Sequence, residues 1–329
     1  MRKAVCAVCV GVCVYAGVVE AQRGEGGPGF AAYPTRPIRL IVPYPPGGGT
    51  DTVGRMLAQK LTEQMGQQVV VDNRGGANAI IGTELAAKAA ADGYTMLLTL
   101  PASVAVNPIL YRNIPYDPAR DFAPVIQLNL IALLLAVHPA VPAKNVAELL
   151  QLAKAKPGQL TYASSGTGGS SHLAIELLQS MSKVDMVHVP YKGGGPALND
   201  LLGGQVQVYA GTVLAALPFV KAGRMRALGV TTAKRLTSLP DVPAIGETIA
   251  GYESTSWQGI VVPRATPANI INRLNADIGK ILRQPEVRDR LTAEGAEVVG
   301  GTPAQFGAFI RSETMKYSKL ITEHGIRVD

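Results

Sequence analysis

Strand-like apolar runs alternate with helix-like stretches from Tyr33 onward. In the first series, strands are expected at 38–42, 68–71 and 95–98, with helices at 50–65 and 80–90 between them. This βαβα order predicts a mostly parallel sheet flanked by helices, because each helix returns the chain to the edge where the next strand begins.

The alternation restarts after a long apolar stretch at 124–137, which indicates a second lobe. Helices are expected at 146–155, 170–181 and 196–202, and strands at 160–163, 186–189, 205–209 and 226–230. A second α/β layer of the same kind, again mostly parallel, is therefore predicted.

The end of the chain is helical. An extended run at 256–262 precedes helices at 267–282, 286–294 and 303–324. These helices have no strands of their own in the pattern, so we expect them to pack on the first lobe. The predicted lobes are 33–129 plus 253–329, and 130–252, with crossovers near 126–137 and 252–262. Two lobes joined by two extended segments form the hinged cleft of periplasmic binding proteins.

The N-terminus has the order of an export signal. A charged start, Met1 to Lys3, precedes an apolar run at 4–19. A membrane anchor is the alternative, but this run is shorter than the roughly 20 residues that a spanning helix needs. We expect 1–32 to be a signal peptide and spacer, the location to be the periplasm, and the mature chain to start between Gln22 and Tyr33.

Composition narrows the classes of function. The chain is 47% hydrophobic and 17% charged, enough to bury a sizeable core. Its net charge of +7 comes from scattered basic residues without a block of five. Nucleic-acid binding is therefore not predicted, whereas an anionic ligand is compatible. All three cysteines lie inside the predicted signal, so the mature chain has no disulfide or zinc-thiolate role: Cys6, Cys9 and Cys13.

A Gly-rich turn between the first strand and the first helix carries the clearest binding signal. It reads Tyr44-Pro45-Pro46-Gly47-Gly48-Gly49-Thr50-Asp51. Glycines let a ligand approach the backbone, and the free N–H groups of a first helical turn form an anion site. We expect Asp51 to point into the turn and to leave the backbone donors to the ligand. A tight turn without a ligand is the alternative.

A second element of the same kind lies in the predicted second lobe. It reads Ser164-Ser165-Gly166-Thr167-Gly168-Gly169-Ser170. Its hydroxyls add donors that suit a carboxylate. Two such loops at matching places in two lobes would face each other across the cleft, so we take Tyr44, 47–51, 164–168 and Ser170 as ligand-binding candidates.

Ser165 and His172 raise the alternative of a hydrolase. The motif Gly-x-Ser-x-Gly is absent, no third catalytic residue is marked, and the spacing across a turn and a helix assures no contact. We expect His172 to be a structural hydrogen-bond partner and the chain not to be an enzyme. The other histidines are spread singly, so we expect no metal and no cofactor: His138, His188 and His324.

Four further residues are candidates for the side walls of the cleft. Ser103, Asn107, Tyr191 and Thr212 each follow a predicted parallel strand, which is where open α/β sheets bind ligands. Ordinary turn or capping chemistry is the alternative for each of them. Lys192 could supply positive charge or be a solvated loop cation.

The ordered motifs resemble the Bug family of periplasmic receptors, the substrate-binding components associated with tripartite tricarboxylate transporters. The resemblance covers 33–329. Besides the two Gly-rich loops, the motifs are Tyr33-Pro34, Pro37-Ile38, Asp92-Gly93-Tyr94-Thr95, Asn107-Pro108, Tyr116-Asp117-Pro118, Asp121-Phe122-Ala123-Pro124-Val125, Ser170-Ser171-His172-Leu173, His188-Val189-Pro190-Tyr191-Lys192-Gly193, Leu202-Gly203-Gly204-Gln205-Val206 and Leu239-Pro240-Asp241-Val242-Pro243.

The resemblance implies a Venus-flytrap (type II) fold in which the two Gly-rich loops grip a small carboxylate, often through waters, for delivery to a membrane transporter. Gly75 and Ile80 stand where the family usually has Pro and Asn. Ala210-Gly211-Thr212 stands where it often has an Asp, so an amino-acid ligand is less expected than a simple carboxylate.

Other classes of function stay open. A sensor would use the same cleft but pass the closed form to a signalling protein, a hydrolase would turn over an ester, and an interaction protein would bind no small molecule. We expect the partners to be a small carboxylate with transporter subunits or a sensor, not nucleic acid, and the protein to be a monomer.

Overall fold

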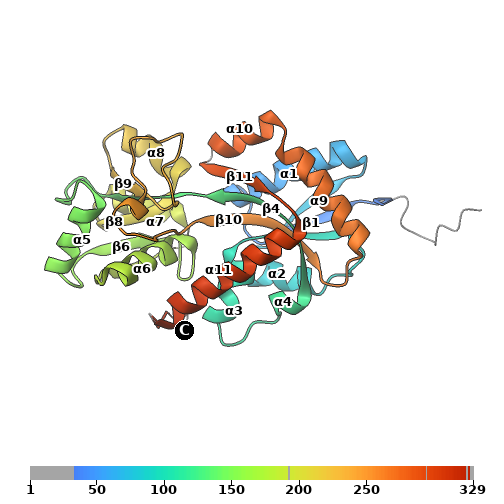
Figure 1. The fold of residues 1–329 in the computed structure, drawn as a ribbon, viewed down its shortest axis with the longest axis horizontal. Helices are drawn as coiled ribbons and strands as arrows, with labels where there is room; N and C mark the ends of the chain where they lie inside the picture. The colour runs from blue at the N-terminus through green and yellow to red at the C-terminus, as the bar shows by residue number, and fades with distance from the viewer. Residues whose placement is uncertain (1–32, 192, 294, 324, 327–329) are drawn as a thin grey trace, which may run out of the picture. The chain divides into compact units, whose positions relative to one another are not determined.

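Two mixed sheets flanked by helices organise the computed structural model, which describes residues 33–191, 193–293, 295–323 and 325–326 (Figure 1). The six-stranded sheet has the order β11-β4-β10-β3-β1-β2, and the five-stranded sheet has the order β7-β6-β8-β5-β9. We call the parts built on them the first and the second lobe. Both belong to one compact unit, Pro34–Asp329. The predicted signal segment, 1–32, lies outside the described residues.

The first lobe contains the N-terminal and C-terminal elements. Its strands are β1 Ile38–Val42, β2 Val69–Asn73, β3 Thr95–Thr99, β4 Phe122–Ile131, β10 Ser256–Pro263 and β11 Ala296–Gly300. Its helices are α1 Gly49–Met65, α2 Ile80–Ala87, the π-helix η1 Ala102–Val106, α3 Asn107–Leu110, α4 Pro118–Asp121, α9 Ala268–Leu282, α10 Pro285–Ala293 and α11 Pro303–Glu323. The predicted absence of strands among the C-terminal helices is wrong, because β11 pairs with the edge of β4.

The second lobe is continuous in sequence. Its strands are β5 Leu133–Val137, β6 Thr161–Ser164, β7 Val187–Pro190, β8 Val208–Thr212 and β9 Arg226–Val230. Its helices are α5 Val146–Ala155, α6 Ser170–Ser182, α7 Gly194–Leu202, α8 Val213–Lys221 and the short 3₁₀ helix η2 Ile245–Glu247.

The sheets are mixed, where the sequence predicted mostly parallel ones. In the first lobe β1 is parallel to β2 and β3, but β10 is antiparallel to β3 and β4. In the second lobe β6 is parallel to β7 and β8, but β5 is antiparallel to β8 and β9. The reason is the double crossover, because a strand that enters a lobe must run opposite to the strand that leaves it.

The chain changes sheets at two places that lie side by side. It leaves the first lobe at Ala132, between β4 and β5, and it returns between Val230 and Ser256. Leu133 and Thr231 exchange two hydrogen bonds: the Leu133 N–H donates to Thr231 Oγ1 (2.9 Å), and the Thr231 N–H donates to the Leu133 carbonyl (3.0 Å). The two crossover segments are thus hydrogen-bonded to each other.

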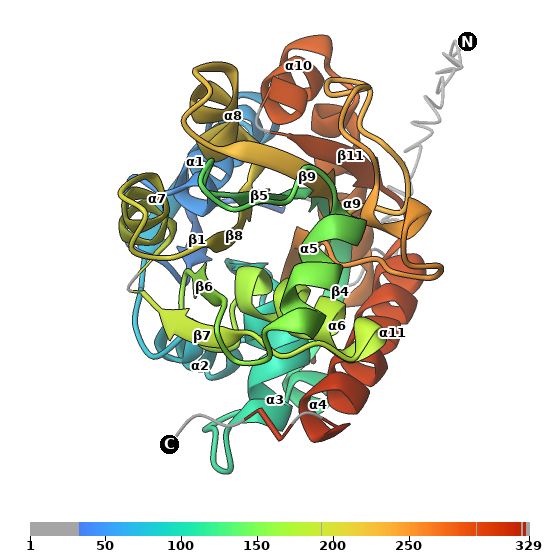
Figure 2. The same ribbon diagram turned by 90° about the vertical axis from the view of Figure 1, so that its left-hand side faces the viewer.

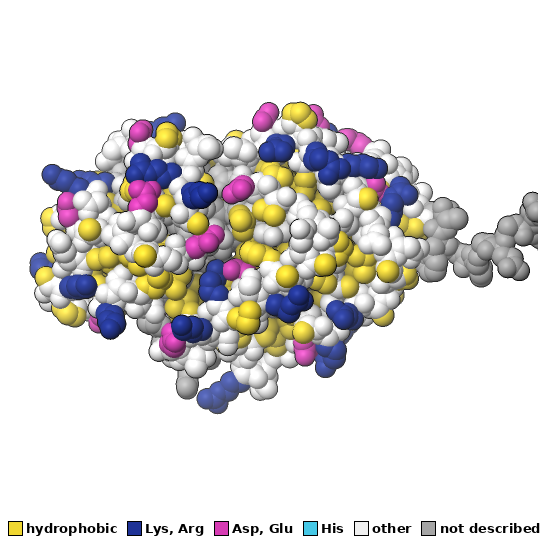
Figure 3. Space-filling model, viewed as in Figure 1, with side chains coloured by type: hydrophobic (Ala, Val, Ile, Leu, Met, Phe, Trp, Pro, Cys, Tyr) yellow, Lys and Arg dark blue, Asp and Glu magenta, His cyan; other side chains and the backbone are white. Residues whose placement is uncertain are grey.

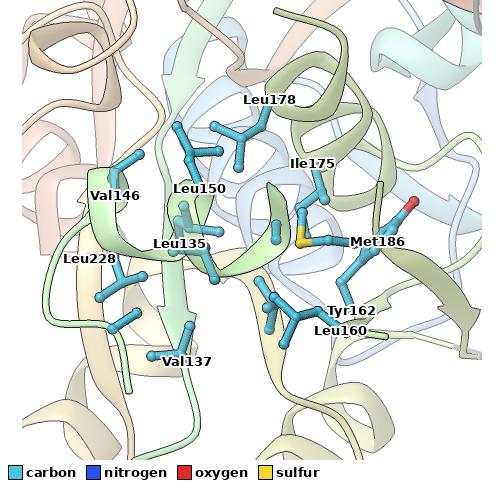
Figure 4. Close-up of a cluster of buried hydrophobic side chains, with 14 of the residues drawn as sticks. Leu135, Val137, Val146, Leu150, Leu160, Tyr162, Ile175, Leu178, Met186 and Leu228 are labelled. Atoms are coloured by element: carbon cyan, nitrogen blue, oxygen red, sulfur yellow. The ribbon is translucent and has the colours of Figure 1, made fainter. Parts of the chain in front are cut away.

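The second lobe has apolar side chains on both faces of its sheet, as the alternation of side chains along a strand requires. On one face Leu135, Val137 and Tyr162 pack with α5 and α6, as the close-up in Figure 4 shows. On the other face Leu134 and Ala163 pack with α7 and α8. Figure 2 shows the two pairs of helices on opposite sides of the strands.

The first lobe brings helices close to its sheet through glycines. A Cβ at Gly54 of α1 would lie 2.8 Å from Val42 of β1, and a Cβ at Gly259 of β10 would lie 2.1 Å from the Phe306 ring of α11. α1 and α11 are therefore seated tightly on β1 and β10, which fixes where the loop before α1 emerges.

Charges of both signs are interspersed on one face of the molecule. On the face seen in Figure 3, Lys and Arg occur over both lobes with Asp and Glu between them. Among the described residues, no helix is both long enough and apolar enough to cross a membrane.

Candidate ligand-binding site

Loop 1 (43–48) joins the buried strand β1 to α1, and Asp51 shapes it. Asp51 Oδ2 accepts from the Gly47 N–H and from Arg55 Nε, both at 2.9 Å, and its Oδ1 accepts from Asn73 Nδ2 at 2.9 Å. The carboxylate points into the turn, as the sequence predicted. Burial acts to raise the pKa of Asp51, but these three donors together hold that pKa below its usual value, so the carboxylate is ionised at neutral pH.

The glycines of loop 1 present an open backbone. Cβ atoms built on Gly47, Gly48 and Gly49 meet nothing within 4 Å, and Gly47 has a φ of +90°, which favours glycine. Gly48 caps α1 without any side-chain hydrogen bond. The first-turn N–H groups of α1, which have no intrahelical acceptor, therefore stand at an open surface.

Loop 2 (165–169) joins β6 to α6 and has the same design. Its N-cap residue is Gly169, again without a side-chain cap. Both the backbone N–H and the hydroxyl of Ser165 lie 2.9 Å from Ser171 Oγ, and the Gly168 N–H donates to His172 Nδ1 at 3.1 Å. The loop is thus held by the first turn of its own helix. The side chains of Thr167 and Ser170 are half-buried.

A buried polar cluster lies beneath loop 2. Ser164 is fully buried, and its hydroxyl lies 2.6 Å from His188 Nε2 and accepts from the Gly166 N–H at 3.1 Å. The Tyr162 hydroxyl donates to Glu176, whose Oε1 is 3.7 Å from His172 Nε2. Burial and then the neighbouring His188 lower the pKa of His172 to about 3. Ser164, a predicted ligand contact, supports the loop from inside.

This geometry gives Ser165 and His172 different partners from those a hydrolase needs. The Ser165 hydroxyl pairs with Ser171, and His172 Nδ1 is occupied by the Gly168 N–H. A serine nucleophile requires a hydrogen bond to its general base. His172 is a structural hydrogen-bond partner, as the sequence predicted.

Loop 3 (74–79) follows β2 and was not predicted as part of the site. It packs on loop 1, because a Cβ at Gly75 would lie 2.7 Å from Pro45 Cδ. Ala77, Asn78 and Ala79 have φ values of 47°, 50° and 72°, a left-handed conformation that is costly for residues other than glycine. The Asn78 amide donates to Asn107 Oδ1 (3.0 Å), and Asn107 Nδ2 donates to the Asn78 carbonyl (2.7 Å).

Two of the predicted side-wall residues are buried. Asn107 is fully buried and clamps loop 3, and Ser103 is fully buried in the π-helix η1, where its carbonyl accepts from the Tyr116 hydroxyl at 2.9 Å. Asn107 thus holds its neighbour in place, whereas the buried Ser103 hydroxyl has no hydrogen-bond partner among the described residues, and its contact with a ligand stays a prediction. Burial, followed by the neighbouring Tyr111 and Tyr116, raises the pKa of Tyr44 in loop 1 to about 12, so its phenol is neutral at physiological pH.

The remaining predicted residues are dispersed. The Tyr191 hydroxyl donates to Asp200 Oδ2 (2.6 Å), and Thr212 is exposed at the end of β8. Thr50 Oγ1 lies 3.5 Å from Nε2 of Gln258, a buried residue of β10 that sequence reasoning missed. Gln258 gives no signal in the sequence, because it sits in an apolar strand without a motif. Lys192 lies outside the described residues.

The lobes meet beside these loops. A Cβ at Gly168 of loop 2 would lie 2.3 Å from Leu110 Cδ2 and 3.6 Å from Asn78 Nδ2, both of the first lobe. Loops 1 and 3 of the first lobe and loop 2 of the second lobe therefore form one neighbourhood. Its chemistry is that of backbone N–H groups, hydroxyls and amides, which suits an anion held by hydrogen bonds. Within the described ranges, no cluster of His, Cys, Asp and Glu could hold a metal ion.

Comparison with known proteins places the chain among solute receptors. The model of the tripartite tricarboxylate transporter family receptor matches residues 53–326. Protein BugT of Bordetella pertussis is 38% identical over 317 residues, which is 95% of this chain and 97% of BugT.

Solved structures agree with these sequence matches. Rpa4515 of R. palustris with adipate has a TM-score of 0.82 at 38% identity, covering 90% of this chain and 99% of Rpa4515. MatC from Rhodopseudomonas palustris with bound malate has a TM-score of 0.77 at 30% identity, covering 88% of this chain and all of MatC, 100%. These likenesses confirm the predicted two-lobed fold of a periplasmic binding protein.

Proposed function

Because the chain belongs to the tripartite tricarboxylate transporter receptor family, we propose that it is exported to the periplasm, binds a small carboxylate between loops 1 and 2, and delivers it to a membrane transporter without bond chemistry. Two of its structural relatives bind carboxylates, adipate in one case and malate in the other. The lobes are proposed to be the units that close on the ligand.

One observation carries this proposal: α1 and α6, the helices that follow loops 1 and 2, each have a glycine N-cap, so no side chain caps them. The N-caps of α1 and α6 are Gly48 and Gly169. α4 and α5 are capped by side chains, Asp117 for α4 and Asn145 for α5, whereas α2, α7, α8 and α9 also lack such a cap. What distinguishes α1 and α6 is their position after loops 1 and 2. A side-chain cap satisfies an N–H group of the first turn. Without it, α1 and α6 keep their donors for a ligand, and the positive end of each helix favours an anion.

The binding proposal is tested with the exported protein and a panel of carboxylates that includes adipate, malate, citrate and benzoate. A ligand that binds only the folded state raises the melting temperature, and calorimetry then gives its affinity. Mass spectrometry of compounds that co-purify with the protein provides an unbiased search. A protein that no carboxylate stabilises, and from which no carboxylate is recovered, does not have the proposed function.

A loop-1 variant links any binding to this site. Gly48 has φ −86° and ψ 170°, an extended conformation that valine adopts readily, and its Cβ would meet open space. Gly48→Val should therefore fold like the wild type and lose carboxylate binding, because its side chain shields the first-turn N–H groups of α1. Unchanged affinity in this variant would place the ligand elsewhere.

Transport is tested separately in cells. A strain that lacks the receptor should regain uptake of the identified carboxylate with the wild-type gene and not with the Gly48→Val gene. An esterase assay with p-nitrophenyl acetate covers the hydrolase alternative, for which we expect no turnover above the buffer rate.

A further inference from the structure

Gly168 of loop 2 is the point at which the second lobe rests on the first. It has a φ of +76°, and the position of its missing Cβ is 2.3 Å from Leu110 Cδ2. Real side chains do not approach so closely, since an ordinary contact begins at 3.4 Å. Only glycine fits between loop 2 and Leu110 when the lobes are in this position.

The first-lobe side of this contact has little freedom to yield. Leu110 is 5% exposed and belongs to a core cluster that includes Val106 and Tyr116. Asn78 is held by its two hydrogen bonds to the buried Asn107, in a left-handed turn that persists only where its surroundings impose it. A side chain packed in this way cannot change its rotamer without disturbing its neighbours.

The second-lobe side is equally fixed. The Gly168 N–H is bound to His172 Nδ1, and the Gly169 N–H donates to the Gly166 carbonyl at 3.2 Å. Leu173, one turn into α6, is 1% exposed and belongs to the same core cluster as Leu110. The start of α6 is thus seated in the apolar core of the first lobe, and the loop that it carries cannot slide past Leu110.

We propose that Gly168, Leu110 and Asn78 form a closing stop, a contact that limits how near loop 2 can come to loop 1 and thereby selects the carboxylate by its length. This inference rests on the proposed function, in which one ligand touches both loops. A ligand gains affinity from closure only through contacts that it makes in the closed state. A ligand too short to span the gap at the stop reaches one loop and loses the donors of the other.

The first test adds a methyl group at the stop. Gly168→Ala should weaken binding of adipate about tenfold or more, a change of about 1.4 kcal/mol per factor of ten, and should abolish ligand-induced compaction in solution scattering. Gly66→Ala is the matched control, because Gly66 has a similar φ of +68° but open space around its Cβ. In this control the alanine is held in the same strained backbone conformation, so the melting temperature should fall, but the affinity for adipate and the ligand-induced compaction should be unchanged.

The second test moves the stop in the opposite direction. Leu110→Ala makes room for the added methyl, so the double variant Gly168→Ala with Leu110→Ala should recover part of the lost affinity. Leu110→Ala alone should shift the preferred ligand to a shorter one in two series, the dicarboxylates of four to eight carbons and the acids benzoate, phenylacetate and 3-phenylpropanoate. The Leu110→Ala variant tests the closing stop by itself if Gly168→Ala does not fold.

The outcomes separate the closing stop from the proposed function. Wild-type affinity and compaction in Gly168→Ala, or an unchanged length preference in Leu110→Ala, overturns the stop and leaves the receptor function intact. A wild-type protein that binds neither series nor any other carboxylate of the panel overturns both.

Discussion

The imidazole rings of His172 and His188 are stacked, with centroids 3.9 Å apart and 17° between the ring planes. His172 holds loop 2 through the Gly168 N–H, and His188 meets the Ser164 hydroxyl that accepts from the Gly166 N–H. Protonated His172 would lose its acceptor at Nδ1, and two stacked imidazolium ions would repel each other. The binding loop therefore depends on both rings being neutral.

We predict that acid destabilises the fold through these two residues. Burial lowers the pKa of His172 to about 3 and that of His188 to about 4, against about 6.5 in an unfolded chain. Above pH ~6.5 both histidines are neutral in the folded and in the unfolded chain. Below this pH the unfolded chain protonates them, whereas the folded chain keeps them neutral. The free energy of unfolding should therefore fall with pH, by up to about 1.4 kcal/mol per pH unit for each histidine.

Denaturant titrations of the wild type and of His172→Asn at pH 7.5, 6 and 4.5 check this prediction. Asparagine offers an acceptor near the position of Nδ1 but does not titrate. The variant should lose less stability between pH 7.5 and 4.5 than the wild type, and equal losses would assign the acid sensitivity to other groups.

Asp51→Asn should destabilise the protein by about 1.5–3 kcal/mol, because the carboxylate accepts from three donors and the variant leaves the Arg55 guanidinium without its ion pair. The pKa of Asp51 is lowered in the fold, so its contribution is present above the unfolded value near 3.9 and is lost as the pH falls below it. Glu63→Gln, on the exposed part of α1, should change stability by less than about 0.5 kcal/mol. Chemical denaturation at pH 7 measures both.

Ala79→Gly should change stability by no more than about 1 kcal/mol, because relief of the left-handed conformation at φ 72° offsets the loss of the buried Ala79 methyl group. Ala86→Gly, inside α2, is the comparison and should destabilise by about 1 kcal/mol or more. If Ala79→Gly proved the more harmful of the two, loop 3 would not carry the strain that its backbone angles indicate.

Thr167→Val and Ser165→Ala together should weaken carboxylate binding, since each lost donor to a charged acceptor costs about 1.5–3 kcal/mol unless water replaces it. Scattering should also show less compaction with ligand. Thr322→Val, at an exposed position of α11, is the control and should bind like the wild type. Full affinity in the loop-2 variant would mean that backbone donors alone hold the ligand.

Much of the fold could be predicted, because apolar periodicity and glycine-rich turns are local signals. The strand at 38–42 and the helix at 146–155 were predicted with their observed bounds. β11 was missed because Ala296–Gly300 contains Glu297 and is only partly buried, so it gives no apolar run, and its pairing with β4 fixes it as a strand. β8 was predicted at 205–209 but lies at Val208–Thr212, since β5 and β6 set its register.

The site was predictable only where its chemistry lies in one segment. The sequence marked both Gly-rich loops, and it placed Asp51 in its turn. It could not show that Asn107 faces Asn78, since that pairing depends on how α3 packs against loop 3. It also gave no reason to expect Leu110 under Gly168, because contacts between lobes depend on the position of one lobe on the other.

The hydrogen bonds between the two crossover segments have a consequence for the proposed opening of the lobes. Thr231 is joined to Leu133 by two hydrogen bonds, and its carbonyl accepts from the Ser254 N–H at 2.9 Å. Two crossover segments joined by these hydrogen bonds can bend together, but twisting one segment against the other would break the bonds. The proposed opening of the lobes should therefore follow a single direction, and Thr231→Val, which removes the Leu133 N–H to Thr231 Oγ1 hydrogen bond, should allow a wider range of lobe orientations.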